Sequence, residues 1–392
     1  AEDGLFPLCI QNYGYFSCLT DPFAGYLLFL SRTLAWPVSL FPVSTWPTVT
    51  NVVSAAAIGL GCGFITWLLV RANVSRAAAA LAGVIPVLIP IVGFEAVNAS
   101  GSAYMILLII AAILVSFSFT PQLPIFVAPM FLLISALTIP SSFVLALPIF
   151  FFVITQPSMR RRQILNLTFL GIGLAFQLTV IVTAENSRAV AITIESLTQW
   201  VSHIPVAAAT LIPLDTQLAG SGMIESTRVP PNQFVGFIFL AAVIAIVSLL
   251  VLKGTARQTS SGLLIMVGIL MGLVPAITGY SNNRYFVIPL VAILIAVVII
   301  FDSLFKSRRN LMIAPLAAVL VLLWVSGFDA SEFRSEARPP WAEMLASIED
   351  GCRANSSGDT QVTFSPDWPF SGAIFLGPTS NLVSCEQLTR SS

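Results

Sequence analysis

Residues 234–252 read FVGFIFLAAVIAIVSLLVL, a run that contains no charged residue. An α-helix of about 20 mostly apolar residues is long enough to cross the hydrocarbon core of a bilayer. Similar runs recur from Thr48 to Val325 with short polar interruptions, and over the whole chain 57% of residues are hydrophobic and 9% are charged. Soluble domains carry about 25% charged residues. The sequence therefore predicts an integral membrane protein that crosses the bilayer many times.

Ten segments are predicted to span the membrane: 48–70, 77–94, 103–118, 122–138, 141–155, 164–183, 234–252, 261–278, 285–301 and 311–327. Helices are expected because the backbone in lipid must satisfy its own hydrogen bonds, and the alternating pattern of an outer-membrane barrel is absent. The numbering starts at Ala1 without a Met, on the side that we assign to the exterior, so we expect a further helix ahead of it. The predicted fold class is an all-α polytopic membrane protein with about ten or eleven transmembrane helices.

Basic residues gather on one side of this predicted topology. If the spans alternate, five loops share a side: residues 71–76, 119–121, 156–163, 253–260 and 302–310. These loops contain ten of the 18 Lys and Arg residues, and their only acid is Asp302. The ten are Arg71, Arg76, Arg160, Arg161, Arg162, Lys253, Arg257, Lys306, Arg308 and Arg309. Because loops rich in Lys and Arg stay in the cytoplasm, this side is predicted to be cytoplasmic and the C-terminus to lie outside.

The outer side carries three segments that are too long to be turns. We divide the chain into a first outer loop with interfacial helices, a transmembrane domain with a long outer loop at 184–233, and an outer C-terminal domain, which cover residues 1–47, 48–327 and 328–392. An interfacial helix is expected over Pro22–Trp36, an apolar stretch whose one charge is Arg32. A second is expected over Glu195–Pro205, ending at the proline.

Cysteine usage fits this topology. Cys9 and Cys18 lie in the first outer loop, and Cys352 and Cys385 lie in the C-terminal segment. An oxidising compartment allows disulfides, so each pair is predicted to be bonded, and the C-terminal pair is expected to close a small α/β or irregular domain. Cys62 is left over within a span and is interpreted as a small packing residue.

Glycines inside two spans predict close helix contacts. They are Gly59, Gly61, Gly63, Gly171 and Gly173. Small residues within a membrane let two backbones approach, and their position inside spans argues against phosphate loops.

The chain begins with an acidic pair, Glu2 and Asp3. Two carboxylates at the start of an outer loop suit a general base, or a divalent cation such as Mg²⁺ or Mn²⁺ held together with phosphate oxygens. The alternative for two residues alone is a solvated helix end.

Four motifs of the first outer loop are taken together: Ala1-Glu2-Asp3-Gly4, Pro22-Phe23-Ala24-Gly25-Tyr26-Leu27, Ser31-Arg32 and Leu40-Phe41-Pro42. The pattern resembles the first external loop of bacterial membrane glycosyltransferases of the C-type (GT-C) superfamily. The resemblance implies many helices, an outer C-terminal domain and a place in the bacterial inner membrane. It also implies inverting sugar transfer, at the outer face, from a polyprenyl-phosphate-linked donor to a cell-envelope glycan, glycolipid or protein.

Roles for individual residues follow from this resemblance and from the chemistry. Asp3, with Glu2 second, is expected to remove a proton from the acceptor hydroxyl. Arg284 and Tyr285 stand at the outer mouth of span 285–301, where a guanidinium can hold a lipid phosphate with two hydrogen bonds. The alternative for these two is an interfacial anchor, because Arg and Tyr both favour membrane boundaries.

The second outer loop adds four candidates that could close over a substrate: His203, Asp215, Glu225 and Arg228. The alternatives are a hydrogen-bonded interfacial histidine and solvated loop charges. A single histidine cannot build a His-rich metal site.

Other function classes stay open. A transporter or flippase for a lipid-linked or small substrate is the runner-up, although such proteins usually keep ionisable residues near the bilayer midplane, and none is predicted here. A lipid-linked oligosaccharide polymerase or ligase and a non-catalytic subunit are further alternatives. The sequence has no P-loop and no basic patch for nucleic acid, so the expected partners are the lipid-linked donor, its acceptor and membrane lipid.

Overall fold

The computed structural model describes residues 2–22, 26–89, 103–117, 123–183, 194–210, 216–219, 222–225, 232–277, 284–304, 314–315, 317–322, 346, 350, 353, 359–361 and 382–384. Five of its helices are long and apolar enough to cross a membrane: α4 (Trp46–Arg71), α10 (Arg160–Thr183), α12 (Gln233–Lys253), α13 (Ala256–Ile277) and α14 (Arg284–Leu304). By their length and composition the chain is an all-α integral membrane protein, as the sequence predicted.

Shorter helices complete the described part. They are α1 (Glu2–Tyr13), α2 (Tyr15–Thr20), α3 (Phe29–Ser39), α5 (Arg76–Leu88), α7 (Tyr104–Ser116), α8 (Val127–Thr138), α9 (Ala146–Thr155) and α11 (Ile194–Thr210), with 3-10 helices at Val43–Thr45, Pro140–Leu145 and Pro157–Met159. Described helical residues occur in each predicted span from 48–70 to 285–301, but the helices described in 77–94, 103–118, 122–138 and 141–155 are only 10–17 residues long. Of the last predicted span, 311–327, the structure describes helical residues 314–315 and 317–322.

Two antiparallel strand pairs occur outside the helices. Strand β1 (Thr216–Ala219) pairs with β2 (Gly222–Glu225), with Thr216 opposite Glu225. Strand β3 (Asp359–Gln361) pairs with β4 (Leu382–Ser384), with Asp359 opposite Ser384. Both pairs lie in segments that the sequence assigns to the outer side.

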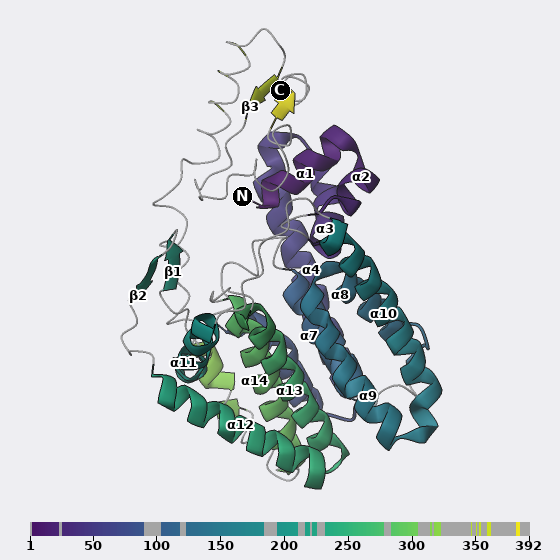
Figure 1. Ribbon diagram of the computed structural model, residues 1–392, viewed down its shortest axis with the longest axis vertical. Coiled ribbons are helices and arrows are strands. Elements are labelled where there is room, and N and C mark those ends of the chain that lie inside the picture. The colour runs from purple at the N-terminus through teal and green to yellow at the C-terminus, as the bar shows by residue number, and fades with distance from the viewer. Residues whose placement is uncertain are drawn as a thin grey trace.

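Helix α7 is the centre of the membrane domain. All of its residues from Tyr104 to Ser116 are buried, as expected of a helix that is apolar on every side. It contacts α4, α8, α13 and α14. Helix α12 is the opposite case, because only 6% of its most apolar window is buried, and it packs on α11 and α13 along one face. In Figure 1, α11 to α14 form one group and α7 to α10 form the other.

One end of the helix bundle joins the loops that the sequence places together on the basic side. The backbone N–H of Ser75 donates to Oδ2 of Asp302 at 3.1 Å, and Nη1 of Arg257 lies 3.7 Å from the same oxygen. At the start of α10, Nη2 of Arg162 donates to the carbonyl of Leu123 at 2.7 Å. These contacts group the helix ends as alternating spans require.

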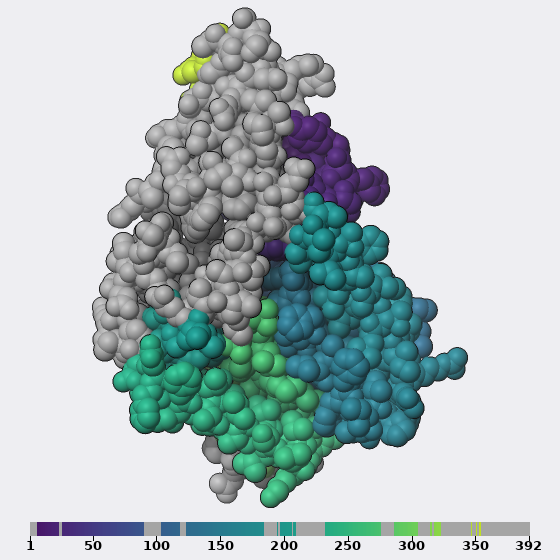
Figure 2. Space-filling model, in the orientation of Figure 1, coloured from purple at the N-terminus to yellow at the C-terminus, as the bar shows by residue number. Residues whose placement is uncertain are grey.

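The opposite end carries the first outer segment, which we define as α1 to α3 (Figure 1). The side chain of Gln177, in α10, accepts a hydrogen bond from the backbone N–H of Leu27 at 2.9 Å and donates to its carbonyl at 3.0 Å. The N–H of Leu30 donates to the hydroxyl of Thr138, the last residue of α8, at 3.3 Å. In Figure 2 the purple surface of this segment accordingly lies beside the teal surface of α10.

The first interfacial helix begins later than predicted. It was expected from Pro22, but α3 starts at Phe29. Leu27 gives its backbone groups to Gln177 in place of a helical turn, and this contact between residues 150 positions apart is not visible in local sequence.

The second interfacial helix extends past its proline. It was predicted to end at Pro205, but α11 continues to Thr210. A proline inside a helix leaves the carbonyl four residues earlier without its N–H partner, and here that residue is Val201. The Val201 carbonyl lies against Gly236 of α12, where a Cβ would collide with it. The glycine thus permits α12 to pack closely on the carbonyl that the proline frees.

Close helix contacts occur at two of the five predicted glycines. A Cβ at Gly61 would meet Cγ1 of Ile106 at 2.5 Å, and one at Gly173 would meet the Cβ of Ala136 at 2.6 Å. For the other three, Gly59, Gly63 and Gly171, no atom of the described residues lies within 4 Å of an added Cβ. These three lie on helix faces that need no small residue for packing. Cys62 is buried next to Gly61, in agreement with its predicted packing role.

Candidate functional site

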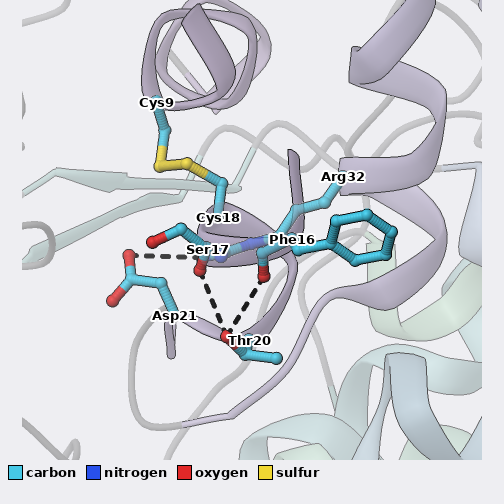
Figure 3. Close-up of a disulfide and its surroundings, with 7 residues drawn as sticks. All are labelled: Cys9, Phe16, Ser17, Cys18, Thr20, Asp21 and Arg32. Carbon is cyan, nitrogen blue, oxygen red and sulfur yellow. Dashed lines mark hydrogen bonds and ion pairs between the residues drawn. A yellow bond between two sulfur atoms is a disulfide. The ribbon is translucent and has the colours of Figure 1, made fainter. Parts of the chain in front are cut away.

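The first outer segment is a small unit closed by a disulfide. Helix α1 turns into α2 at Gly14, whose φ of 83° is a left-handed conformation that glycine adopts without steric cost. The turn brings Cys9 and Cys18 to a Cα separation of 5.9 Å, and they are bonded (Figure 3). This confirms the first predicted disulfide. Cys352 and Cys385, the second predicted pair, lie outside the described residues.

A buried arginine lies beneath this disulfide-bonded turn. Arg32, in α3, is 1% exposed. Its Cζ lies 5.3 Å from the centroid of the Phe6 ring, and its Nη2 lies 3.8 Å from Oδ2 of Asp21. Figure 3 shows the Arg32 side chain reaching toward Asp21 from α3. Within the described residues, none of its three guanidinium nitrogens has a hydrogen-bond partner.

Burial acts on both partners of this ion pair. The side chain of Asp21 is 44% exposed. Its pKa is raised from 3.8 chiefly by burial, and the charge of Arg32 only partly offsets that effect. Burial likewise lowers the pKa of Arg32 to about 10, against a smaller opposing effect of Asp21. For each residue, therefore, the loss of hydration outweighs the attraction of its partner.

Sequence reasoning did not assign a role to Arg32 or Asp21. The available signal was that Arg32 is the one charge in the apolar stretch Pro22–Trp36. Whether such a charge snorkels to water or is buried depends on what packs around it. Here α1 and α2 cover it.

The predicted catalytic and phosphate-binding residues lie at two helix starts. Glu2 and Asp3 are the first two residues of α1, and Arg284 and Tyr285 are the first two of α14. The side chains of all four lie outside what the structure describes. Their proposed contacts with each other and with substrate therefore stay predictions.

Of the four loop candidates, His203 is the one whose side chain is described. It is 3% exposed, and its Nδ1 lies 2.7 Å from the carbonyl of Gln199. A carbonyl only accepts, so Nδ1 donates the proton in this bond. Nε2 is buried and has no hydrogen-bond partner among the described residues. The buried, hydrogen-bonded position matches the structural alternative for this residue.

Helix α11 connects this histidine to the start of α14. Trp200, one turn before His203, stacks on Phe286 with ring centroids 5.9 Å apart. Phe286 directly follows Arg284 and Tyr285 in the chain. The structure thus brings the helix of His203 against the helix that begins with the predicted phosphate-binding residues.

The remaining loop candidates are less defined. Glu225 is the last residue of β2, opposite Thr216, and its side chain is not described. Asp215 and Arg228 lie outside the described residues. The described part of the chain contains no group of three or more His, Cys, Asp or Glu residues that could hold a metal ion, and it leaves the predicted cation site at Glu2 and Asp3 untested.

Comparisons of the chain with models of protein families, with curated proteins and with solved structures find no match. A functional proposal therefore rests on the sequence pattern and on the position of charge along the helices.

Proposed function

We propose that the chain is a membrane glycosyltransferase that moves a sugar from a polyprenyl-phosphate-linked donor to an acceptor at the outer face of the membrane. The proposal takes its reaction class from the resemblance of the first outer loop to GT-C enzymes. The acceptor class is a cell-envelope glycan, glycolipid or protein.

The observation that carries the proposal is the position of charge along the spanning helices. Every charged residue of the five lies in the first or last three residues of its helix: Arg71, Arg160, Arg161, Arg162, Lys253, Arg257, Arg284 and Asp302. Ion-coupled transport usually relies on ionisable groups near the midplane, each of which costs at least about 2.5 kcal/mol to insert. Chemistry at a membrane face needs none there.

The proposed roles divide between the two helix starts. Asp3, supported by Glu2, removes the proton of the acceptor hydroxyl as that oxygen attacks the anomeric carbon and the bond to the donor phosphate breaks. Arg284, with Tyr285 beside it, offsets the charge that grows on the departing lipid phosphate. If a divalent cation such as Mg²⁺ or Mn²⁺ participates, Glu2 and Asp3 are its proposed ligands. His203, Asp215, Glu225 and Arg228 stay candidates for substrate contacts from the second outer loop.

The finer topology belongs to the same proposal. We propose about ten or eleven transmembrane helices in the bacterial inner membrane, with the basic loops in the cytoplasm. Interfacial helices line the outer loops. The C-terminal segment 328–392 is an outer domain closed by a Cys352–Cys385 disulfide. Labelling of single introduced cysteines near Asp359 and near Arg161 tests this, because reaction of both from the same side would contradict the orientation.

The activity test uses the full chain, purified in detergent. Polyprenyl-phosphate donors with different radiolabelled sugars are offered together with a cell-envelope fraction as acceptor. Wild type should transfer label, and Asp3→Asn should slow transfer by about 10² to 10⁴-fold because a general base is lost. Arg284→Lys keeps the charge but loses the planar fork, so it should lower kcat/KM for the donor.

Matched controls separate these effects from general damage. Asp350→Asn changes an exposed carboxylate, and Arg161→Lys changes an exposed arginine at the other end of the bundle. Both should keep wild-type rates. Full activity in both Asp3→Asn and Glu2→Gln would remove the acidic pair from the mechanism. Movement of an unaltered lipid-linked substrate across vesicles, with no transfer of sugar, would favour the transporter or flippase instead.

A further inference from the structure

We propose that Arg32 binds the phosphate group of a membrane lipid at the outer face. Until the phosphate binds, Asp21 is the ionic partner of Arg32, and the phosphate then replaces it. The site is the buried guanidinium of α3 together with the carboxylate that follows α2. It lies in the first outer segment, and the preceding section gives no role to Arg32 or Asp21.

The first argument is the unmet bonding of the arginine. A guanidinium has five N–H donors, and leaving buried donors without acceptors costs free energy that folding must offset. Arg32 is 1% exposed, and its Nε, Nη1 and Nη2 atoms have no hydrogen-bond partner within the part of the chain that the structure describes. A side chain in that state is poised for an acceptor with several oxygens.

Asp21 does not satisfy this demand. Its Oδ2 lies 3.8 Å from Nη2 of Arg32, which is too far for a hydrogen bond, and its side chain is 44% exposed. Burial is the main cause of the raised pKa of Asp21 and of the lowered pKa of Arg32. The attraction between the two charges is therefore weaker than the cost of removing them from water. Because Asp21 is both the anionic partner and the more exposed one, it can turn outward and admit another anion.

The surroundings favour a lipid as the carrier of that anion. Large apolar side chains of this segment and of the two residues after it are exposed: Tyr13 at 49%, Phe16 at 80%, Trp36 at 48%, Leu40 at 67% and Phe41 at 47%. Aromatic residues of this kind gather at the headgroup level of a membrane. The backbone of Leu27 and Leu30 is bonded to the outer ends of α10 and α8, which holds α3 at the same level. A lipid phosphate at this depth meets Arg32 without leaving the bilayer surface.

Phosphate also suits the N–H groups of Arg32 as a hydrogen-bond acceptor. Arginine binds phosphate oxygens through two parallel N–H groups, and such charge-assisted bonds are the strongest hydrogen bonds in proteins. The ring of Phe6, 5.3 Å from Cζ, packs on one face of the guanidinium, whose N–H groups point outward in its own plane. The identity of the lipid as a polyprenyl phosphate rests on the proposed function, whereas the phosphate site itself does not.

The test measures binding rather than turnover. The full chain is purified in a maltoside detergent, which contains no phosphate, and lipid binding is measured by native mass spectrometry and by the shift in Tm. The ligands are a short polyprenyl phosphate, the matching polyprenol, phosphatidylglycerol and inorganic phosphate. Wild type should bind the polyprenyl phosphate at least about ten-fold more tightly than the polyprenol, the equivalent of one charge-assisted hydrogen bond.

Two variants should move affinity in opposite directions. Arg32→Gln should weaken binding by about ten-fold or more, with Arg32→Lys in between. Asp21→Asn should tighten it by about three-fold or more, because the competing carboxylate is gone. The control pair Arg353→Gln and Asp350→Asn changes an exposed ion pair and should leave affinity unchanged. Mapping of the Cys9–Cys18 disulfide in each variant verifies that the segment folds.

The opposite signs separate the proposal from a structural ion pair. If Arg32→Gln and Asp21→Asn both weaken binding, or if neither changes it, the proposal is wrong. Equal binding of phosphatidylglycerol supports the site and assigns it to lipid phosphates in general, while binding of inorganic phosphate alone overturns the lipid as its source. If wild type transfers no sugar but still binds the lipid phosphate in an Arg32-dependent way, the result counts against the proposed function only.

Discussion

Asp302 offers the most direct test of how one end of the bundle is held together. Its side chain is 1% exposed, it accepts a hydrogen bond from the backbone N–H of Ser75 at 3.1 Å, and it pairs with Arg257 at 3.7 Å. It therefore joins the start of α5 to the start of α13 from the last turn of α14. Replacing this one residue loosens three helices at once.

The expected cost differs between two substitutions. In Asp302→Asn an amide oxygen can still accept from Ser75, so the loss is about 1 kcal/mol from the weaker hydrogen bond and at most about 1 kcal/mol from the ion pair, whose Arg257 is 31% exposed. In Asp302→Ala the Ser75 N–H loses this acceptor. The hydrogen-bond part of the cost is then about 1–3 kcal/mol, and the ion-pair part stays the same. We expect about 1–2 kcal/mol for Asn and about 1–4 kcal/mol for Ala, with Ala costing more than Asn.

The assay is equilibrium unfolding of the purified chain in mixed micelles, with helix content as the signal. Arg76→Gln serves as control, because it removes an exposed charge next to Ser75 and should change the free energy of unfolding by less than about 0.5 kcal/mol. Equal costs for Asn and Ala would show that the Ser75 hydrogen bond contributes nothing. If Asp302→Asn and Asp302→Ala each lower the free energy of unfolding by less than the control does, the role of Asp302 is refuted.

Three further changes test other contacts. Gly236→Ala should cost about 1–3 kcal/mol in the same assay, because its methyl group would collide with a carbonyl of α11, whereas Gly63→Ala, whose Cβ meets no described atom, should stabilise by about 0.5–1 kcal/mol. Replacing Cys9 and Cys18 together by Ser should cost about 2–3 kcal/mol and make the effect of reductant on Tm smaller than in wild type, because the proposed Cys352–Cys385 bond remains. The folded chain binds the proton of Asp21 more tightly than the unfolded chain, so wild-type Tm should fall as pH rises from 3.8 through the raised pKa, a step that Asp21→Asn should lack.

The candidate site was partly predictable. The Cys9–Cys18 bond could be predicted because the two cysteines lie close together in the sequence, in one segment on the predicted outer side. The burial of Arg32 could not, because it depends on α1 and α2 folding over α3, and local sequence shows only a charge in an apolar stretch. From the sequence, His203 was a candidate for substrate contact in the second outer loop. The structure buries it in α11, where Nδ1 donates to the carbonyl of Gln199.

The sequence by itself indicated that the chain spans a membrane and where most of its helices run, and it predicts which of their ends share a side. Those properties follow from hydropathy and charge summed over neighbouring residues, so no long-range contact is needed to see them. Only the tertiary structure decided that α7 is enclosed while α12 is largely exposed, although both are apolar throughout. It also decided that Gln177 binds Leu27 across 150 residues and that α3 starts at Phe29. Such pairings depend on which helix faces meet, and packing settles this only when the whole chain has folded.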